Sequence, residues 1–293
     1  MSDATPAPGS MEGKTCLITG ATSGLGAVAA DALAHAGARV IVVGRDKARC
    51  DESATRLRSL GGADSFGIAA DLSNQAYVRR LADEVRNRVT RLDVLLNNAG
   101  AMFAERTETV DGVEKTWALN HLGYFLLTNL LIEPLKAAGS ARVVSVASDA
   151  HRAAFGIDFD DPEMKRRKYR PFRAYAQSKL ANILFAFELA RRLEGTGVTS
   201  NCLHPGFVAT SFFNGRERMF RLMKLAAWLV ALTPEKGART SIYLASSPDV
   251  TGVSGRYFER CRPAKPARPA NDPEAARRLW DLSAGRTRLV ESA

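Results

Sequence analysis

The stretch KTCLITGATSGLG at residues 14–26 decides the fold of this chain. Residues 14–19 are mostly apolar and predict a buried β-strand, and the Ala-rich segment at residues 24–35 predicts a helix. Between them the glycines at positions 20, 24 and 26 allow backbone N–H groups to approach a pyrophosphate at the positive end of the helix dipole. A glycine triplet alone leaves an ordinary turn open, and its G-x-x-x-G-x-G spacing differs from the common G-x-G-x-x-G fingerprint. Because it joins the first strand to the first helix, we predict a dinucleotide-binding loop.

The alternation of short apolar runs with longer helical segments continues along the chain. Further strands are expected at residues 39–43, 66–70, 92–96, 142–146, 198–203 and 256–258, and helices at residues 46–60, 74–89, 113–136, 174–193 and 235–245. Strands that are apolar on both faces and followed by helices indicate a parallel sheet covered on both sides. The expected fold is therefore a single-domain, doubly wound α/β sheet of the Rossmann type. The domain is predicted at residues 11–260, after a disordered lead-in at 1–10 and before a polar tail with a short helix at 261–293.

The composition is average for a globular protein, apart from its charge. Of 293 residues, 46% are hydrophobic and 25% are charged, which excludes a disordered chain, a collagen-like repeat and a coiled coil. The 41 Lys and Arg residues exceed the 31 Asp and Glu residues and give a net charge of +10. Such an excess points to nucleic acid or an anionic membrane as partners. No helix-turn-helix, zinc finger or aromatic-basic strand motif supports nucleic acid, which we therefore do not expect to bind.

The cysteines and the N-terminal residues indicate the compartment. The four cysteines lie far apart, form no CxxC pair and have no zinc spacing with histidine, so no metal site is expected. This usage fits a reducing, cytoplasmic location. Residues 1–10 lack the basic and apolar regions of a signal peptide, and no run of about 18 apolar residues predicts a membrane-spanning helix.

Arg45, directly after the expected strand at residues 39–43, indicates which dinucleotide binds. A site for NAD places a carboxylate at this strand end, whereas an arginine suits the 2′-phosphate of NADP. Arg45 therefore favours NADP over NAD. The alternative is that Asp46 merely caps the next helix and that Arg45 is a solvated surface residue. Asp71, after the third strand, is placed to accept a hydrogen bond from the adenine amino group, to cap the following helix, or to do both.

Tyr175 and Lys179 form a Y-x-x-x-K pair inside a predicted helix. Residues four apart share a helix face, so the phenol and the ammonium project together. A nearby cation lowers the pKa of a phenol and makes it a usable general acid and base. The spacing is common by chance and gains weight from Ser148, which follows the strand at residues 142–146. Because ligands of open α/β sheets bind outside the carboxyl ends of the strands, these groups and the glycine loop are expected at one edge.

Taken in order, these motifs resemble the short-chain dehydrogenase/reductase family. The shared features are T-G-x-x-x-G-x-G at residues 19–26, N-N-A-G at 97–100, an asparagine in ALNHLG at 118–123, the serine and Y-x-x-x-K just described, and P-G at 205–206. They span nearly the whole chain, and their occurrence together in this order is highly specific. The segments RVVSVASDAH at 142–151 and HPGFVAT at 204–210 resemble the retinol dehydrogenase and WW-domain oxidoreductase branch.

The resemblance implies a role for each catalytic residue. Tyr175 would donate a proton to a carbonyl oxygen on reduction, or take one from an alcohol. Ser148 would hydrogen-bond that oxygen, with Ser145 as a competitor that the motif alignment disfavours. Lys179 would hold the nicotinamide ribose hydroxyls and tune the tyrosine, and Asn120 would help to hold a water that relays protons.

The resemblance also implies a set of cofactor contacts for NADP(H). The phosphates would lie on the loop, the adenosine half along the ends of the third and fourth strands, and the carboxamide after the strand at 198–203. The residues are, in that order, Gly20, Ser23, Gly24, Leu25 and Gly26; Asp71, Leu72, Asn98, Ala99 and Gly100; and Pro205, Gly206 and Thr210, with Tyr175 and Lys179 at the ribose.

Two variable stretches border this site. Residues 211–232 interleave aromatic and aliphatic residues with basic ones in an amphipathic helical pattern, and in this family such a segment closes over the substrate. Its apolar content favours a lipophilic or aromatic substrate, with ordinary core packing as the alternative. Basic and aromatic residues on one helix also leave a weak membrane-surface contact open. The insertion at residues 152–173 has acidic residues followed by basic ones and predicts a charged, solvated loop.

Two hypotheses follow for the function. The first is an NADP(H)-dependent oxidoreductase that transfers a hydride between nicotinamide and a lipophilic or aromatic aldehyde or ketone, or the matching alcohol. The alternative is a catalytically silent dinucleotide sensor or interaction module on the same fold, which has no physical need for the complete catalytic set. The segments at residues 113–136 and 174–193 are apolar over more than one face, and because such helices commonly form a dimer interface in this family, a homodimer also stays open.

Overall fold

The strand expected in the opening stretch, β1 (Thr15–Thr19), is buried along its whole length near the middle of an eight-stranded sheet. The computed structural model describes residues 5–206, 213–214 and 233–289. The strand order is β10-β9-β7-β6-β4-β1-β2-β3, and every neighbouring pair is parallel except β10 with β9. The other strands of the sheet are β2 (Arg39–Gly44), β3 (Phe66–Ala69), β4 (Val94–Asn97), β6 (Arg142–Val146), β7 (Thr199–His204), β9 (Tyr257–Glu259) and β10 (Arg262–Ala264).

The strand order reverses on either side of β1, and this reversal positions the site. The chain runs from β1 outward to β2 and β3, then returns to place β4 on the other side of β1. Connections on opposite faces leave a crevice outside the carboxyl ends of the strands at such a point. The doubly wound parallel sheet predicted from the sequence is therefore confirmed, and its crevice lies at the ends of β1 and β4.

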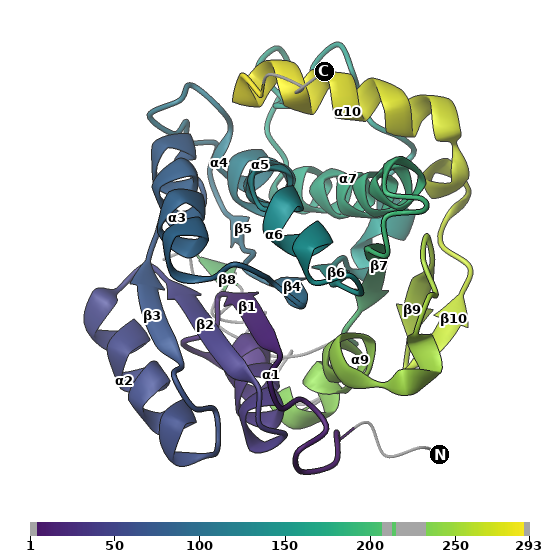
Figure 1. Ribbon diagram of the computed structural model, residues 1–293. Coiled ribbons are helices and arrows are strands. Elements are labelled where there is room, and N and C mark those ends of the chain that lie inside the picture. Colours follow the sequence, from purple (N-terminus) through teal and green to yellow (C-terminus); the bar gives the residue numbers. More distant parts are fainter. Residues whose placement is uncertain (1–4, 207–212, 215–232, 290–293) are drawn as a thin grey trace.

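Helices cover both faces of the sheet (Figure 1). Side chains of α1, α2 and α9 form a buried cluster against one face, and those of α3, α5 and α7 against the other. No helix among the described residues is long and apolar enough to cross a bilayer. The bounds of these helices are α1 (Gly24–His35), α2 (Lys47–Ser59), α3 (Gln75–Arg88), α5 (Gly123–Leu130), α7 (Pro171–Arg192) and α9 (Pro234–Ser246).

The region from 113 to 136, expected as one helix, is broken into four pieces. These are α4 (Lys115–Trp117), a π-helical turn η1 (Ala118–Leu122), α5, and α6 (Ile132–Ala137). The break before α6 lies at Leu131, where φ is −107° and ψ is 12°. Pro134 explains a new start here, because proline has no N–H for a bond to the preceding turn and is tolerated only near the beginning of a helix.

The C-terminal region is more than the polar tail expected from the sequence. The strand β10 joins the sheet, and the 15-residue helix α10 (Pro273–Thr287) packs against α7, where it forms a further layer (Figure 1). Trp280 is buried, with its ring centre 4.9 Å from that of Phe125 in α5 and 6.0 Å from that of Phe185 in α7. Short helical turns precede it at η2 (Asp149–Ala153), η3 (Pro248–Val250) and η4 (Arg268–Asn271).

This packing accounts for the second apolar face of α5 and α7. Phe125 and Phe185 contact the sheet-side cluster and Trp280 together, so the helix pattern that suggested a dimer interface is satisfied within one chain. A polar contact adds to this cover, because the buried His121 ring is 2.8 Å from the hydroxyl of Ser283 in α10. The apolar pattern is thus explained within one chain, and the homodimer stays a prediction from the sequence.

The contact between α10 and α7 predicts a large effect of shortening Trp280. Trp280→Ala should lower the free energy of unfolding by about 3–5 kcal/mol, because it leaves a cavity between two helices. Urea unfolding followed by circular dichroism measures this loss. Arg277→Ala, an exposed position in the same helix, is the matched control and should stay within about 0.5 kcal/mol of the unsubstituted protein. Equal effects at the two positions would contradict the assigned packing.

Candidate active site

The buried hydroxyl of Thr19 joins the glycine loop to the end of β4. It accepts hydrogen bonds from the backbone N–H groups of Asn98, at 2.8 Å, and Ala99, at 3.0 Å, and is 3.4 Å from the carbonyl of Leu96. In return, the Asn98 side chain donates to the carbonyl of Thr19 at 2.8 Å. The T-G and N-N-A-G motifs, about 80 residues apart in sequence, thus form one hydrogen-bonded unit. Thr19 was not among the predicted site residues, because its role depends on a strand that follows much later.

The loop after β1 has the shape of a phosphate cradle. Gly20 adopts a φ of +69°, and a Cβ added at Gly26 would lie 2.4 Å from the carbonyl oxygen of Gly20. Ser23 precedes α1 without a side-chain cap, and no acidic residue lies in the first turn, which contains Gly24 and Leu25. The N–H groups at this helix start are therefore free of a competing carboxylate and suit the pyrophosphate of a dinucleotide.

Arg45 is exposed directly after β2 and forms no hydrogen bond or ion pair with the described residues. Asp46 caps α2, as its carboxylate accepts from the N–H of Arg49 at 3.0 Å. The Arg49 guanidinium donates to the carbonyl of Thr22 in the glycine loop at 3.1 Å. A second cation that the sequence did not indicate therefore borders the loop, and no signal in the sequence alone could have placed it there.

Asp71 does not cap the next helix, so that interpretation is wrong. Asn74 is the cap of α3, and its side chain accepts from the N–H groups of Ala76 and Tyr77. One Asp71 oxygen accepts from the N–H of Ser73 at 3.0 Å and from its hydroxyl at 2.8 Å. The other Asp71 oxygen has no hydrogen bond to the described residues, which fits a role as an acceptor at the strand edge.

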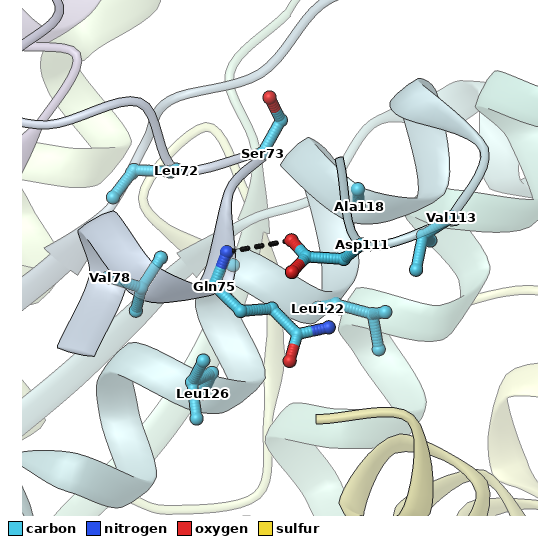
Figure 2. Close-up of a pocket in the computed structure, with 10 residues that line it drawn as sticks. Leu72, Ser73, Gln75, Val78, Asp111, Val113, Ala118, Leu122 and Leu126 are labelled. Atoms are coloured by element: carbon cyan, nitrogen blue, oxygen red, sulfur yellow. Dashed lines mark hydrogen bonds between the residues drawn. The ribbon is translucent and has the colours of Figure 1, made fainter. Parts of the chain in front are cut away.

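Leu72 points into a small pocket behind this edge, shown in Figure 2. The pocket lies between the start of α3 and the π-helical turn, and Val113, Leu122 and Leu126 line it. At its rim the N–H of Gln75 donates to Asp111 at 2.9 Å. Leu72 as a whole is 4% exposed, and its contact with a cofactor stays a prediction.

Tyr175 and Ser148 meet at the carboxyl end of β6. The phenol of Tyr175 is buried and hydrogen-bonded to the Ser148 hydroxyl, which also accepts from the N–H of Ala150 at 3.2 Å. Ser145 is fully buried within β6, and its hydroxyl has no hydrogen bond to the described residues. Of the two serines, Ser148 is therefore the one that hydrogen-bonds to the tyrosine.

Burial dominates the proton affinities of Tyr175 and Lys179. Burial raises the pKa of Tyr175, and the hydrogen bond from Ser148 opposes this only in part. Burial likewise lowers the pKa of Lys179 to about 7. Its ammonium donates to the carbonyl of Val146 at 2.8 Å and lies 5.6 Å from the centre of the Tyr175 ring. Burial is therefore the largest influence on the pKa of the phenol, and the tuning of Tyr175 by Lys179 stays a prediction.

Asn120 lies in the π-helical turn, and its side chain hydrogen-bonds both backbone groups of Ala101, the residue after N-N-A-G. Its side-chain oxygen accepts from the N–H of Ala101 at 2.9 Å, and its amide nitrogen donates to the Ala101 carbonyl and to the hydroxyl of Ser178, both at 3.0 Å. A Cβ added at Gly100 would lie 3.2 Å from that oxygen and 3.4 Å from the ammonium of Lys179. π-helical turns are frequent at functional sites, and this one brings Asn120 and Lys179 to the same small space.

The substrate side of the site is described in part. Pro205 and Gly206 follow the end of β7, with Gly206 at a φ of +88°. Thr210 and nearly all of the expected lid at 211–232 lie outside the described residues. The backbone of β8 (Phe213–Asn214) pairs with β5 (Met102–Phe103), and Met102 packs against Tyr175. The segment after β7 therefore returns beside the tyrosine.

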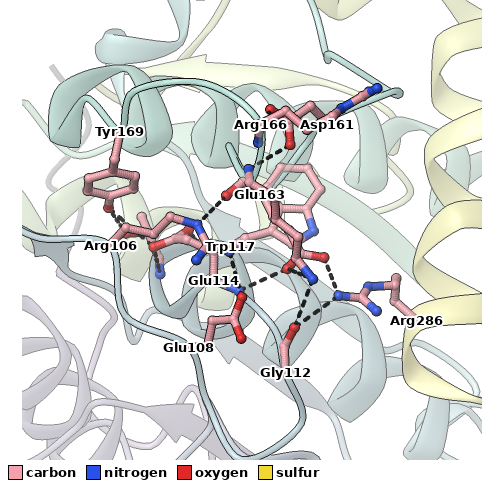
Figure 3. A network of polar contacts seen from close by, with 12 residues as sticks. Arg106, Glu108, Gly112, Glu114, Trp117, Asp161, Glu163, Arg166, Tyr169 and Arg286 are labelled. Atoms are coloured by element: carbon pink, nitrogen blue, oxygen red, sulfur yellow. Dashed lines mark hydrogen bonds and ion pairs between the residues drawn. The ribbon is translucent and has the colours of Figure 1, made fainter.

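The insertion at 152–173 is anchored by buried acidic groups (Figure 3). Glu163 is 5% exposed, forms an ion pair with Arg286 of α10 and accepts from the N–H of Glu114 at 3.0 Å. Asp161, 8% exposed, accepts from the N–H groups of Lys165 and Arg166. The expectation of a solvated loop is wrong for these two carboxylates. Partners in α10 and at Glu114 compensate the burial of Glu163, and N–H groups of the insertion itself compensate that of Asp161.

Glu114 links this insertion to the catalytic helix region. Its carboxylate caps α4 by accepting from the N–H groups of Thr116 and Trp117, and it also accepts from the hydroxyl of Tyr169 at 3.2 Å. Tyr169 in turn is 3.3 Å from the carbonyl of Phe103 in β5. Glu114 and Tyr169 thus hold β5, whose first residue, Met102, contacts the candidate catalytic tyrosine. Among the described residues, no group of three His, Cys, Asp or Glu side chains is arranged to hold a metal ion.

Comparison with known proteins places the chain in a family. The sequence model of the family described as short chain dehydrogenase matches residues 14–157. Retinol dehydrogenase 14 of Mus musculus is 47% identical over 94% of this chain and 86% of the relative. Polyprenol dehydrogenase of Mus musculus is 41% identical over 92% of this chain and 82% of the relative. The chain belongs to the short-chain dehydrogenase family.

Solved structures agree with this assignment. The crystal structure of an uncharacterized protein from Mycobacterium Paratuberculosis has a TM-score of 0.79 and 36% identity, and the match covers 97% of each chain. The Pseudomonas aeruginosa RhlG/NADP active-site complex has a TM-score of 0.65 and 30% identity, with 86% of this chain and 96% of that chain covered. The protein is therefore an oxidoreductase of a family that binds nicotinamide dinucleotides, with retinol dehydrogenases among its relatives.

The buried state of Lys179 predicts how stability depends on pH. Because burial lowers its pKa to about 7, the unfolded chain binds more protons at this position above that pH. The stability of the unsubstituted protein should therefore rise, relative to Lys179→Met, from about pH 7 to about pH 9, by at most about 1.4 kcal/mol per pH unit.

Urea unfolding of both proteins without added cofactor measures this difference. Lys236→Met, at an exposed position of α9, serves as the charge-matched control. A difference between the unsubstituted protein and Lys179→Met that stays constant or shrinks as the pH rises would contradict a lysine that is buried and largely neutral above pH 7.

Proposed function

We propose that the protein is an NADP(H)-dependent oxidoreductase that interconverts a lipophilic or aromatic aldehyde or ketone and the matching alcohol. One observation carries the proposal. The buried phenol of Tyr175 is hydrogen-bonded to Ser148 at the carboxyl edge of the sheet, the same edge that holds the glycine cradle at Gly20 and Gly26. A proton donor thus lies at the place where a dinucleotide of this fold presents its reactive ring.

The residues of this chain supply the proton chemistry of the reaction. A bound nicotinamide supplies the hydride on reduction, or accepts it on oxidation. Because burial raises its pKa, Tyr175 is protonated at neutral pH and can donate to a carbonyl oxygen. Ser148 hydrogen-bonds the same oxygen and orients it.

Two guanidinium groups support NADP over NAD. Arg45 is exposed and without a partner among the described residues, at the end of β2 where the 2′ position of the adenosine ribose would lie. Arg49 reaches the loop from the first turn of α2. Asp46, the carboxylate that directly follows Arg45, is engaged as the cap of α2. A planar guanidinium binds a phosphate through two parallel hydrogen bonds and suits this arrangement.

The substrate is proposed to be apolar. Relatives named for retinol and polyprenol dehydrogenase activity act on lipophilic alcohols, and the candidate lid at 211–232 is rich in aromatic and aliphatic residues. The free cysteines at positions 16, 50, 202 and 261 support our proposal of a cytoplasmic location. A homodimer and a weak membrane-surface contact stay predictions from the sequence.

Removing the phenol hydroxyl tests the proton donor. Tyr175→Phe should lower kcat by about 10²–10⁴-fold, because the proton transfer loses its donor, while the dissociation constant for NADPH changes far less. A panel of lipophilic aldehydes, ketones and alcohols, followed by the absorbance of the reduced nicotinamide, supplies the measurement. Tyr77→Phe, at an exposed position, is the control. Full turnover by Tyr175→Phe would contradict the assignment, and a folded, NADPH-binding protein without turnover on any substrate would favour the silent dinucleotide sensor.

Reversing the charge at Arg45 tests the cofactor. Arg45→Asp should weaken NADPH binding by about 10–100-fold, since a charge-assisted contact is lost and a repulsive charge is added. Binding of NADH should weaken little or improve, because a carboxylate at this position can accept from the ribose 2′-hydroxyl. Fluorescence titration with both cofactors measures the change, with Arg277→Asp as the exposed control. Equal affinity of the unsubstituted protein for NADH and NADPH would contradict the assignment of Arg45 to the 2′-phosphate.

A further inference from the structure

The carbonyl of Ser148 receives two hydrogen bonds from one residue, His151. The backbone N–H of His151 donates to it at 3.1 Å, and Nδ1 of the imidazole lies 2.7 Å from the same oxygen. On the opposite edge of the ring, the backbone N–H of Ala267 donates to Nε2 at 3.0 Å. The ring is fully buried and stands edge-on to Tyr257, with ring centres 5.2 Å apart. Both nitrogens of a buried imidazole therefore have a defined partner.

These two partners determine the tautomer of the ring. A carbonyl oxygen only accepts, so Nδ1 must carry the proton that lies between it and Ser148. A backbone N–H only donates, so Nε2 must be the unprotonated nitrogen. A cationic His151 would place a second proton against the N–H of Ala267. The geometry thus requires a neutral ring with its proton on Nδ1.

The groups around the ring are consistent with a neutral imidazole. Burial lowers the pKa of His151 and Arg152 acts in the same direction, while the hydrogen bond to Ser148, Asp149 and Glu259 oppose them. The other titratable groups that face the ring are His204 at the end of β7 and Tyr257 in β9. The Arg152 guanidinium pairs with both carboxylates and donates to the carbonyl of Lys265 at 3.0 Å. The segment that carries Ala267 is therefore tied to η2 at two points.

We propose that His151 is a positioning residue for Ser148, held in its active tautomer by the C-terminal segment at Ala267. The proposal rests on the proposed function, in which Ser148 hydrogen-bonds the reacting oxygen. Ser148 caps η2 with extended backbone angles, and its side chain has to point at Tyr175. Two donors on its carbonyl fix the peptide plane, and this sets the direction of the hydroxyl. His151 acts through the serine and does not touch the substrate.

Two substitutions test the hydrogen bonds at the two ring nitrogens separately. An Asn amide lies as many bonds from Cα as Nδ1 does, so His151→Asn keeps a donor to Ser148 and loses the acceptor for Ala267. A Gln side chain reaches as many bonds as Nε2, so His151→Gln keeps the acceptor and loses the donor. We expect kcat to fall about tenfold or more in His151→Gln and His151→Ala, but less than about threefold in His151→Asn, with the KM for NADPH unchanged in all three. His35→Ala, at an exposed position of α1, is the control.

The tautomer is measured independently of activity. The chain has four histidines, so the long-range ¹H–¹⁵N spectrum of the ¹⁵N-histidine-labelled full-length protein is simple, and the signals missing from His151→Asn assign the ring. At neutral pH we expect a protonated Nδ1 and an unprotonated Nε2. A proton on Nε2, or a cationic ring, would overturn the proposal even where a substituted protein fails to fold.

The outcomes separate this inference from the proposed function. Unchanged kcat in His151→Gln, or a loss in His151→Asn as deep as in His151→Ala, overturns the positioning role and leaves the oxidoreductase intact. A substituted protein with unchanged kcat but a raised KM for NADPH also overturns it, because the residue would then act on cofactor binding. Absence of turnover in the unsubstituted protein overturns the proposed function, while the NMR result still decides the tautomer.

Discussion

The site depends on one buried hydroxyl, that of Thr19. It ends β1, accepts the N–H groups of Asn98 and Ala99 after β4, and lies against the carbonyl of Leu96. A polar group at zero exposure is stable only when it is fully hydrogen-bonded, so this contact holds the two central strand ends in one register. The register brings Gly26 so close to Asn98 and Gly20 that an added Cβ does not fit, and Gly20 itself has a φ of +69°, which favours glycine. The glycine cradle is a consequence of that packing.

The candidate catalytic residues are positioned at the same sheet edge by hydrogen bonds and ion pairs between segments that are far apart in the sequence. The hydrogen bonds from Asn120 to Ala101 continue the strand end fixed by Thr19, and they place Asn120 beside Gly100 and Lys179. The buried Glu114 and Glu163 then tie β5 and the insertion to α10. Since these carboxylates are buried, removing one partner would leave a charge without compensation, so the outer segments and the site are energetically linked.

The sequence predicted the parts of the structure that local patterns encode. The strands, the glycine loop, and the placement of Ser148 and Tyr175 at one sheet edge follow from periodicity and from strand order. The predictions from the sequence were wrong where a partner far away in the sequence determines the local structure. The sequence predicted a solvated Glu163, whereas the structure pairs this carboxylate with Arg286, over 120 residues later. The break at Leu131, the cover of α7 by α10, and the dominance of burial in the pKa of Tyr175 all require packing that no single segment reveals.

Burial also changes which basic residues can attract an anionic cofactor. Lys179, proposed at the nicotinamide ribose, is only partly protonated at neutral pH because burial lowers its pKa to about 7. Tyr175 stays neutral because burial raises its pKa. The interior of the site therefore contributes little positive charge toward an anionic dinucleotide. In the proposed function that attraction comes from exposed groups at the loop, Arg45 and Arg49, together with the uncapped start of α1. Cofactor affinity and proton transfer are thus assigned to different residues, and substitutions can alter one without the other.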